Sequence, residues 1–233
     1  MKYVPYESRL DAGKILANYI LKSDQELDHA IKNNKNQHFT FAIPNGGVPV
    51  AEGFCSELQY RYSLIIVRKI KIPYNTEAGF GSVTTDGTVL INESLLDGLN
   101  LSSQAIEKSI LTTKKEIEER LIFYNITETF ENKFREEIRN KNIFMIDDGL
   151  ASGFTMLAAI KMIKKYEPKQ IFVAVPTAPM RTVKKIEKHA DEIFCPNIRN
   201  VWRFAVAEAY KNWYDLPESE VLEIIQKSSY FVE

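Results

Sequence analysis

Two neighbouring carboxylates stand between an apolar run and a stretch of small residues. Residues 143–146 are all apolar, and Asp147 and Asp148 follow them directly. The next segment, 149–155, is rich in glycine, alanine, serine and threonine, so its backbone could approach a ligand closely. Backbone N–H groups at the start of a following helix are unpaired and lie at the positive end of its dipole, which favours a phosphate group. The pattern therefore predicts a sugar-phosphate site in which the acids face ribose hydroxyls, with or without Mg²⁺.

The same residues also have a purely structural interpretation. Asp147 and Asp148 could simply cap a helix that follows a strand, because Asp and small residues are common at such junctions. Two familiar phosphate loops are excluded, since the chain has no GxxxxGK[ST] and the glycines at 149 and 153 do not form GxGxxG. This segment alone leaves both interpretations open.

Other short segments place polar residues directly after apolar runs. Asn45, Gly46 and Gly47 follow one run and could form only a turn. Arg68 and Lys69 end a second run and could be a solvated strand end. Singly, each of these structural interpretations is favoured over a ligand site.

Apolar segments alternate with amphipathic ones along the chain, which is typical of a mainly parallel sheet covered by helices on both faces. In such folds, ligands bind at the carboxyl ends of the strands, so the chemistry is expected just after Ile43, Val67, Ile146 and Val175. Segment 71–86 is expected to be a long loop or a pair of weak strands. The predicted strands are 39–43, 63–70, 142–146, 170–175 and 192–195, and the predicted helices are 8–22, 48–58, 103–124, 155–166 and 180–190.

Composition and charge are those of an ordinary globular domain. The chain has 233 residues and a formal net charge of −1 at pH 7, so no overall positive field would attract nucleic acid or an anionic membrane. Cys55 and Cys195 lie far apart in apolar surroundings and are interpreted as small core residues. No stretch is long enough to span a bilayer, and no apolar leader opens the chain. We expect a cytoplasmic protein without a membrane partner.

Segment 143–155 resembles the signature of the type I phosphoribosyltransferases, which is an apolar strand, two acids and a small-residue loop that ends close to Thr-Gly-x-Thr. Here Ser152 stands where Thr is commoner. Further segments resemble the same family in the same order, so the resemblance covers nearly the whole chain. They are the pyrophosphate loop at 43–50, the Arg/Lys pair in 67–69, the flexible loop of a subgroup with uncharacterised substrate at 73–87, and matches at 173–179 and 213–214.

The resemblance implies a fold class and a role for each part of the site. The expected fold is α/β, type I phosphoribosyltransferase-like, with a mainly parallel sheet flanked by helices and a small hood. Asp147 and Asp148 would hold the ribose hydroxyls and favour the positive charge that develops on the ring. The backbone amides that would bind the 5′-phosphate are those of Ala151, Ser152, Gly153, Phe154 and Thr155.

The leaving pyrophosphate would be bound by the backbone of Asn45, Gly46 and Gly47, with Arg68 and Lys69 as catalytic cations. Mg²⁺ would sit mainly on substrate oxygens and water, with no protein ligand beyond a contribution from the two acids. In the nearest relatives an Arg usually stands where this chain has Asn45. A missing cation there would weaken stabilisation of the leaving group by about one to a few kcal/mol. A cis peptide bond is expected between Pro44 and Asn45.

The resemblance also implies one domain over residues 1–233. Its hood would come from the N-terminal segment and about 196–233, and a flexible loop at about 73–90 would close over the site. Trp213 and Tyr214 are interpreted as core or dimer contacts rather than as a base-stacking platform. Family members commonly dimerise, so a homodimer is expected.

The expected activity is transfer of phosphoribose from phosphoribosyl pyrophosphate (PRPP) to a purine, pyrimidine or related base. One alternative is a regulator that senses PRPP or a nucleotide and binds nucleic acid; another is a binding protein that has lost transfer chemistry. A basic face could serve the regulator, but interspersed Glu residues favour a solvated helix and argue against nucleic acid. That face would comprise Lys114, Lys115, Lys133, Arg135 and Arg139.

Overall fold

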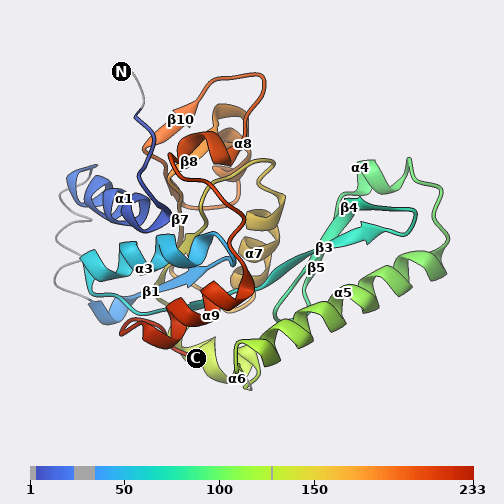
Figure 1. Cartoon of the computed structure of the whole chain (residues 1–233). Helices are drawn as coiled ribbons and strands as arrows, with labels where there is room; N and C mark the ends of the chain where they lie inside the picture. Colours follow the sequence, from blue (N-terminus) through green and yellow to red (C-terminus); the bar gives the residue numbers. More distant parts are fainter. Residues whose placement is uncertain (1–3, 24–34, 127) are drawn as a thin grey trace.

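The computed structural model describes residues 4–23, 35–126 and 128–233. At its centre is a five-stranded sheet in the order β2-β1-β6-β7-β9 (Figure 1). Every neighbouring pair in this sheet is parallel. The strands are β1 (His38–Ala42), β2 (Tyr62–Leu64), β6 (Asn142–Ile146), β7 (Gln170–Ala174) and β9 (Glu192–Phe194). The predicted parallel sheet is confirmed.

Two apolar cores, one on each face of the sheet, explain why its strands are almost continuously apolar. In β6, Phe144 and Ile146 belong to one core, and Ile143 and Met145 belong to the other. This alternation follows from the two-residue repeat of a strand. Helices α1 (Arg9–Ser23), α3 (Gly47–Leu58) and α9 (Glu218–Lys227) cover the first face. Helices α6 (Phe130–Ile138), α7 (Phe154–Lys164) and α8 (Met180–Ile186) cover the second.

Helices α1 and α3 pack closely because a glycine on each helix faces the backbone of the other. A methyl group on Gly13 would overlap the carbonyl oxygen of Val50, and one on Gly53 would overlap that of Leu10. The hydroxyl of Ser8 accepts a hydrogen bond from the Asp11 amide at 3.1 Å at the start of α1. This packing fixes the first turn of α1 beside the carboxyl end of the sheet.

A second, antiparallel sheet leaves the main body together with a long helix, and we call this unit the arm (Figure 1). Its strand order is β3-β4-β5, and α5 packs along it. The arm consists of β3 (Val67–Ile72), β4 (Asn75–Thr84), β5 (Val89–Ile91), α4 (Glu93–Leu96) and α5 (Ser103–Phe123).

The prediction of one strand over 63–70 is wrong, because the chain changes sheets at Ile65 and Ile66. The Ile65 amide still bonds the carbonyl oxygen of Ala42 at 3.0 Å, whereas the Ile66 amide donates to Thr85 Oγ1 in the arm at 2.7 Å. The run is apolar on both sides of the break, so its composition carries no sign of the change. As a result, Arg68 and Lys69 lie on β3 of the arm and not at the end of a strand of the main sheet.

Segment 71–86 mostly forms β-structure and is not an irregular loop. Strand β4 is ten residues long and pairs with both β3 and β5. The pairing with β3 shifts register near Lys71, which fits the weak strand pattern of the sequence. Whether this hairpin moves over the site stays a prediction.

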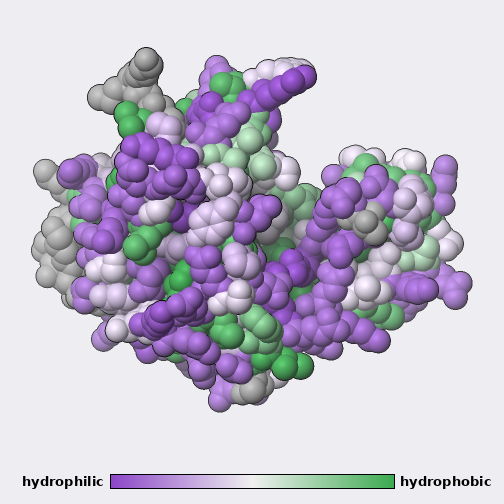
Figure 2. Space-filling view, viewed as in Figure 1, coloured by the Kyte–Doolittle hydropathy of each residue, from purple (hydrophilic) through white to green (hydrophobic). Residues whose placement is uncertain are grey.

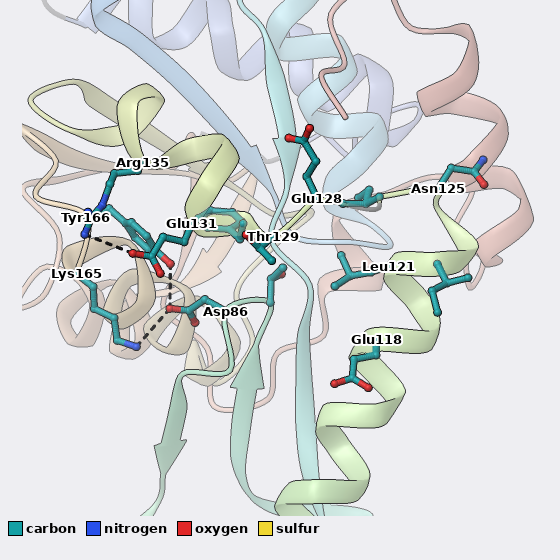
Figure 3. Close-up of a pocket in the computed structure, with 14 residues that line it drawn as sticks. Asp86, Glu118, Leu121, Asn125, Glu128, Thr129, Glu131, Arg135, Lys165 and Tyr166 are labelled. Carbon is teal, nitrogen blue, oxygen red and sulfur yellow. Dashed lines mark hydrogen bonds and ion pairs between the residues drawn. The ribbon is translucent and has the colours of Figure 1, made fainter.

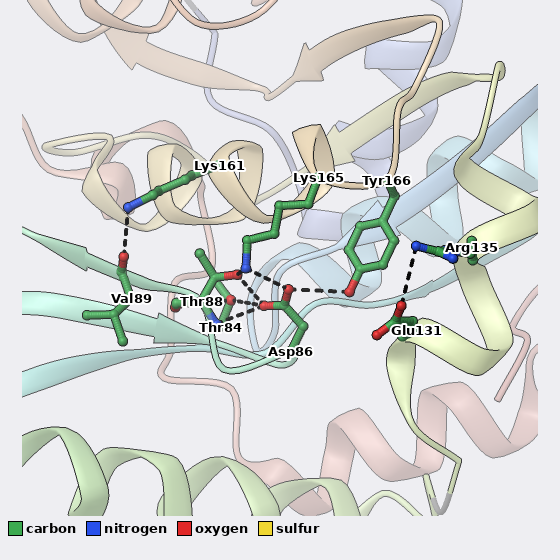
Figure 4. A network of polar contacts seen from close by, with 9 residues as sticks. All are labelled: Thr84, Asp86, Thr88, Val89, Glu131, Arg135, Lys161, Lys165 and Tyr166. Carbon is green, nitrogen blue, oxygen red and sulfur yellow. Dashed lines mark hydrogen bonds and ion pairs between the residues drawn. The ribbon is translucent and has the colours of Figure 1, made fainter.

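The turn between β4 and β5 is fastened to α7 by a polar network centred on Asp86 (Figure 4). The Asp86 carboxylate accepts hydrogen bonds from the Thr88 amide at 2.8 Å and from the Thr84 hydroxyl at 2.8 Å. From the end of α7, Lys165 Nζ and the Tyr166 hydroxyl each approach the other carboxylate oxygen at 3.3 Å. The base of the arm is therefore tied to the helix that follows the small-residue loop.

The C-terminal segment crosses the carboxyl end of the main sheet. It includes β10 (Asn197–Arg199), which pairs in parallel with β8 (Thr177–Pro179), and the short helix η2 (Val206–Ala209). Tyr6 bridges to Tyr210, so the N-terminal segment lies beside it. These elements, like η1 (Lys35–Gln37), are too short to leave a pattern in the sequence. Among the described residues, no helix combines the length and the apolar character needed to cross a membrane.

Candidate active site

A cavity of about 520 Å³ lies at the carboxyl ends of the central strands. The space-filling view shows the surface hollowed between the arm and the rest of the body (Figure 2). Residues of the sheet, the arm, α1 and the C-terminal segment contribute to the cavity wall. The residues of the wall that could take part in chemistry or in ligand binding are Arg9, Asn45, Gly46, Arg68, Lys69, Arg120, Asp147, Asp148, Thr155, Trp213 and Asp215.

Asp147 and Asp148 follow β6 directly and line this cavity. The Asp148 amide donates to Asp147 Oδ1 at 2.8 Å, so the first carboxylate turns back onto the backbone of the second. Asp148 Oδ2 accepts a hydrogen bond from Arg9 Nε at 2.8 Å, and its side chain is 14% exposed. Asp148 therefore forms an ion pair with Arg9, and this pair lies on the cavity wall and not away from the opening.

Burial raises the pKa of both carboxyl groups. For Asp147, the neighbouring charge of Asp148 raises the pKa further. For Asp148, the Arg9 guanidinium opposes the effect of burial. The pKa of Asp147 is raised more than that of Asp148, so Asp147 is the stronger base of the two carboxyl groups.

Arg9 is the main site residue that sequence reasoning missed. Its Nη1 donates to the carbonyl oxygen of Tyr214 at 3.1 Å, and its guanidinium lies 4.1 Å from the centre of the Trp213 ring. The Tyr210 hydroxyl donates to the carbonyl oxygen of Asp148 at 2.6 Å. The C-terminal segment thus holds both partners of the ion pair. Trp213 is neither a plain core residue nor a bare stacking surface, because Arg9 covers one face of its ring.

The loop after β1 lies against the acidic pair. The expected cis peptide bond between Pro44 and Asn45 is present. A methyl group on Gly46 would overlap the Asp148 carboxylate, so only glycine allows this approach. Asn45 Nδ2 donates to the carbonyl oxygen of Leu216 at 2.7 Å, while Asn45 Oδ1 is buried with no hydrogen-bond partner among the described residues.

The small-residue loop turns directly into α7. Gly153, just before the helix, has φ of 73°, a conformation that glycine adopts at little cost. The Thr182 hydroxyl fixes the loop by donating to the carbonyl oxygen of Ala151 at 2.6 Å. Phe154 N donates to Ser152 Oγ at 3.3 Å, whereas the amides of residues 151–153 have no acceptor among the described residues.

A smaller hollow of about 260 Å³ adjoins the cavity, since Lys69 and Thr155 line both. Ser152 and Phe154 form one side of it, and Gly79 and Gly81 of β4 form the other. The proposed phosphate loop therefore faces the arm.

The two predicted cations take different positions. Arg68 points into the cavity and pairs with Glu218 at 3.5 Å. Lys69 Nζ donates to the carbonyl oxygen of Glu77 in the arm. A third cation, Arg120 of α5, also lines the cavity and pairs with Glu218. No sequence pattern pointed to Arg120, because it stands among many charged residues of an amphipathic helix.

A larger hollow of about 1060 Å³ lies between α5, α6 and the base of the arm (Figure 3). It contains none of the predicted site residues. Its most buried acid, Asp86, is already satisfied by the network described above. We therefore take the cavity of about 520 Å³ at the carboxyl ends of the strands as the candidate site.

The oxygens available to a metal ion are those of the acidic pair. In the part of the chain that the structure describes, no three or more His, Cys, Asp or Glu side chains gather as a metal site. Two carboxylates fit a Mg²⁺ ion that takes most of its ligands from a substrate and water.

Comparison with known proteins gives consistent matches. The sequence pattern of the phosphoribosyl transferase domain matches residues 10–209. Two Mycobacterium tuberculosis proteins, from strains CDC 1551 and H37Rv and provisionally named phosphoribosyl transferases, are 27% identical over 187 residues. The match covers 80% of this chain but 41% of theirs, so the chain spans less than half of the length of these relatives.

A solved structure, that of the Thermus thermophilus protein TT1426, has the same fold. The TM-score is 0.70 at 21% sequence identity, and the match covers 95% of this chain and 97% of the other.

Proposed function

The chain belongs to the phosphoribosyl transferase family, and we propose that it transfers phosphoribose from PRPP to a nitrogenous base and releases pyrophosphate. The observation that carries this proposal is the shared cavity. Asp147, Asp148, Asn45 and Arg68 come from three distant segments and meet there at the edge of one sheet.

Binding would use both ends of the ribose. The amides of residues 151–153, which have no acceptor among the described residues, and the start of α7 suit the 5′-phosphate. The acidic pair suits the ribose hydroxyls. Arg68 and Lys69 lie on the arm side, where the pyrophosphate group would be. Holding both ends aligns the reacting carbon with an incoming base and limits its exposure to water.

In the transfer step, the bond between C1 of the ribose and the pyrophosphate oxygen breaks, and its electron pair leaves with pyrophosphate. A bond forms between C1 and a nitrogen of the base, as positive charge develops on the ring. The adjacent carboxylates stabilise that charge. Asp147, whose pKa is raised, is suited to accept the proton that the base nitrogen loses. When bound, Mg²⁺ would offset phosphate charge, held mainly by substrate oxygens and water with a contribution from Asp147 and Asp148.

Two features favour a binding protein without turnover as the second candidate. Arg9 already pairs with Asp148, which would have to share its charge with the substrate. Asn45 brings no cation to the pyrophosphate loop, and its side-chain nitrogen Nδ2 already donates a hydrogen bond to the carbonyl oxygen of Leu216.

A base-panel assay separates the two candidates. The protein is incubated with PRPP, Mg²⁺ and each purine, pyrimidine or related base, and pyrophosphate release is measured beside Asp147→Asn and Asp148→Asn. Base-dependent release that both substitutions abolish would support transfer. PRPP binding by calorimetry without release for any base would support the binding protein. Equal release by wild type and both variants would reject the assignment of the carboxylates.

A further inference from the structure

Two arginines and one glutamate meet on the arm side of the cavity. Arg68 lies on β3 and Arg120 on α5, while Glu218 is the first residue of α9. Arg68 Nη2 lies 3.5 Å from Glu218 Oε1, and Arg120 Nη2 pairs with the same oxygen. One carboxylate oxygen is therefore shared by two guanidinium groups from different elements.

The cluster holds more donors than acceptors. The Arg120 side chain is 7% exposed, and its Nε has no hydrogen-bond partner among the described residues; the same is true of Arg68 Nε. Burial lowers the pKa of Arg120, and the nearby charge of Arg68 lowers it further. A buried donor without an acceptor costs free energy. A ligand with several negatively charged oxygens would satisfy both arginines better than one carboxylate does.

Building on the proposed function, we propose that Arg68 and Arg120 together form the pyrophosphate site, and that Glu218 is an internal counter-ion which pyrophosphate displaces. Arg120 thereby supplies from α5 the cation that the loop at Asn45 lacks. Arginine suits this role because its planar fork can donate two hydrogen bonds to one phosphate group.

The position of Glu218 fits a counter-ion that can leave. Its side chain is 39% exposed, so it can turn into solvent without being buried elsewhere. As the first residue of α9, it stays beside the positive end of the helix dipole after release. Arg120, in contrast, is fixed by burial and remains in the cavity.

A purely structural role makes a different prediction. If Glu218 only ties α9 to β3 and α5, its loss would loosen the cavity and weaken anion binding. If Glu218 competes with pyrophosphate for the two arginines, its loss would strengthen binding. The sign of the effect therefore separates the two roles.

The test is calorimetric titration of the full chain with inorganic pyrophosphate in Mg²⁺-containing buffer. We expect Arg120→Gln to weaken binding about tenfold or more and Glu218→Gln to strengthen it about threefold or more, as for charged hydrogen bonds gained or lost. Arg61→Gln and Glu137→Gln are matched controls, because this pair lies 3.1 Å apart outside the cavity. Both controls should bind as wild type does.

Unchanged affinity in a folded Arg120→Gln variant would overturn the proposal, as would weaker binding by Glu218→Gln or no binding by wild type. If Arg120→Gln does not fold, Arg120→Lys replaces it, and a loss of affinity is again expected because the fork is gone. Because no transfer is measured, the outcome is independent of the base-panel assay. If Arg120→Gln binds pyrophosphate more weakly and Glu218→Gln binds it more tightly, but no base accepts phosphoribose, the proposed function is rejected and the pyrophosphate site is supported.

Discussion

At the scale of single residues, the two acids of the site differ although they are neighbours. Arg9 stabilises the negative charge of Asp148 at 2.8 Å, whereas Asp147 faces the charge of Asp148. The two adjacent acids therefore differ in basicity, and Asp147 is the stronger base. This division follows from an arginine almost 140 residues away in the chain.

Replacement of Asp147 is expected to lower turnover and to raise the thermal stability of the chain. Because the pKa of Asp147 is higher in the folded chain than its ordinary value of 3.8, the folded state loses stability as pH rises from that value through the raised pKa. Asp147→Asn removes the free-energy cost of a buried, ionised carboxylate and keeps a side-chain oxygen that can accept the hydrogen bond of the Asp148 amide. We expect Tm at pH 7 to rise by about 2–4 °C for each kcal/mol gained, and turnover to fall about 100-fold or more.

Thermal unfolding at pH 7 and pH 4 measures this effect, with exposed Asp97→Asn as the control. The gain in Tm should be present at pH 7 and largely gone at pH 4. A variant less stable than wild type at pH 7 would contradict the account of the buried pair.

At the scale of elements, the close packing of α1 on α3 positions a charged residue of the candidate site. Gly13 and Gly53 let α1 and α3 approach until backbone meets backbone. That approach brings Arg9, the first residue of α1, to Asp148. The contact between two helices thus sets the geometry of an ion pair in the cavity.

Gly53→Ala tests this contact. Alanine favours a helix more than glycine does, by about 1 kcal/mol, yet here its methyl group would overlap the carbonyl oxygen of Leu10. We expect a net loss of about 1–3 kcal/mol in the free energy of unfolding by urea, as for other overpacked sites. Gly98→Ala is the control, since the nearest atom to its added methyl group would be Leu95 O at 3.5 Å. Equal stabilities of the two variants would show that the helices can separate freely.

The arm depends on Asp86 for its attachment to α7. Burial would raise the pKa of Asp86, but hydrogen bonds from Thr88 and Thr84 and the charge of Lys165 outweigh it and hold the pKa below 3.8. A lowered pKa stabilises the folded state above the ordinary value, and this stability is lost as pH falls through the folded-state pKa.

We expect Asp86→Asn to cost about 1–2 kcal/mol of stability at pH 7 and to speed hydrogen exchange at residues 84–89. The difference in the free energy of unfolding between wild type and Asp86→Asn should stay constant between pH 7 and pH 5 and become smaller below pH 4. Asp97→Asn, on the exposed end of the same arm, should change neither quantity. Unchanged exchange at 84–89 in Asp86→Asn would mean that the network does not hold the turn.

At the scale of the whole molecule, the charge distribution gives little support to a nucleic-acid surface. The basic face considered from the sequence is interrupted by acids, since Arg135 pairs with Glu131 at 3.4 Å and Arg139 with Glu167 at 3.3 Å. The cavity is lined by four cations, Arg9, Arg68, Lys69 and Arg120. This arrangement fits the small anionic ligand of the proposed function.

Assembly is the prediction that belongs to this scale. From the family resemblance we expect a homodimer, and light scattering after size exclusion should give twice the monomer mass at micromolar concentration. Trp202, which is 91% exposed, offers a fluorescence probe, because an interface that covers it would shift its emission on dilution. A monomer mass across the concentration range would reject the dimer.

The sequence alone determined the parallel sheet and the acidic junction, because both follow from local patterns. The apolar run at 143–146 is long enough to predict β6. The two acids and the small residues follow it without interruption up to residue 155, so the junction can be recognised from one segment. The same holds for Cys55 and Cys195, which are buried as expected.

Only the tertiary structure decided where the chain changes sheets and which distant cations line the candidate site. The break at Ile65 and Ile66 lies within an apolar run that suits either sheet. Arg9 and Arg120 look like ordinary charged residues of helices, and their roles arise from helix packing and from burial against a partner far along the chain. Local composition determines what a segment can form, whereas the pairing of charges depends on contacts that close only when the whole chain is folded.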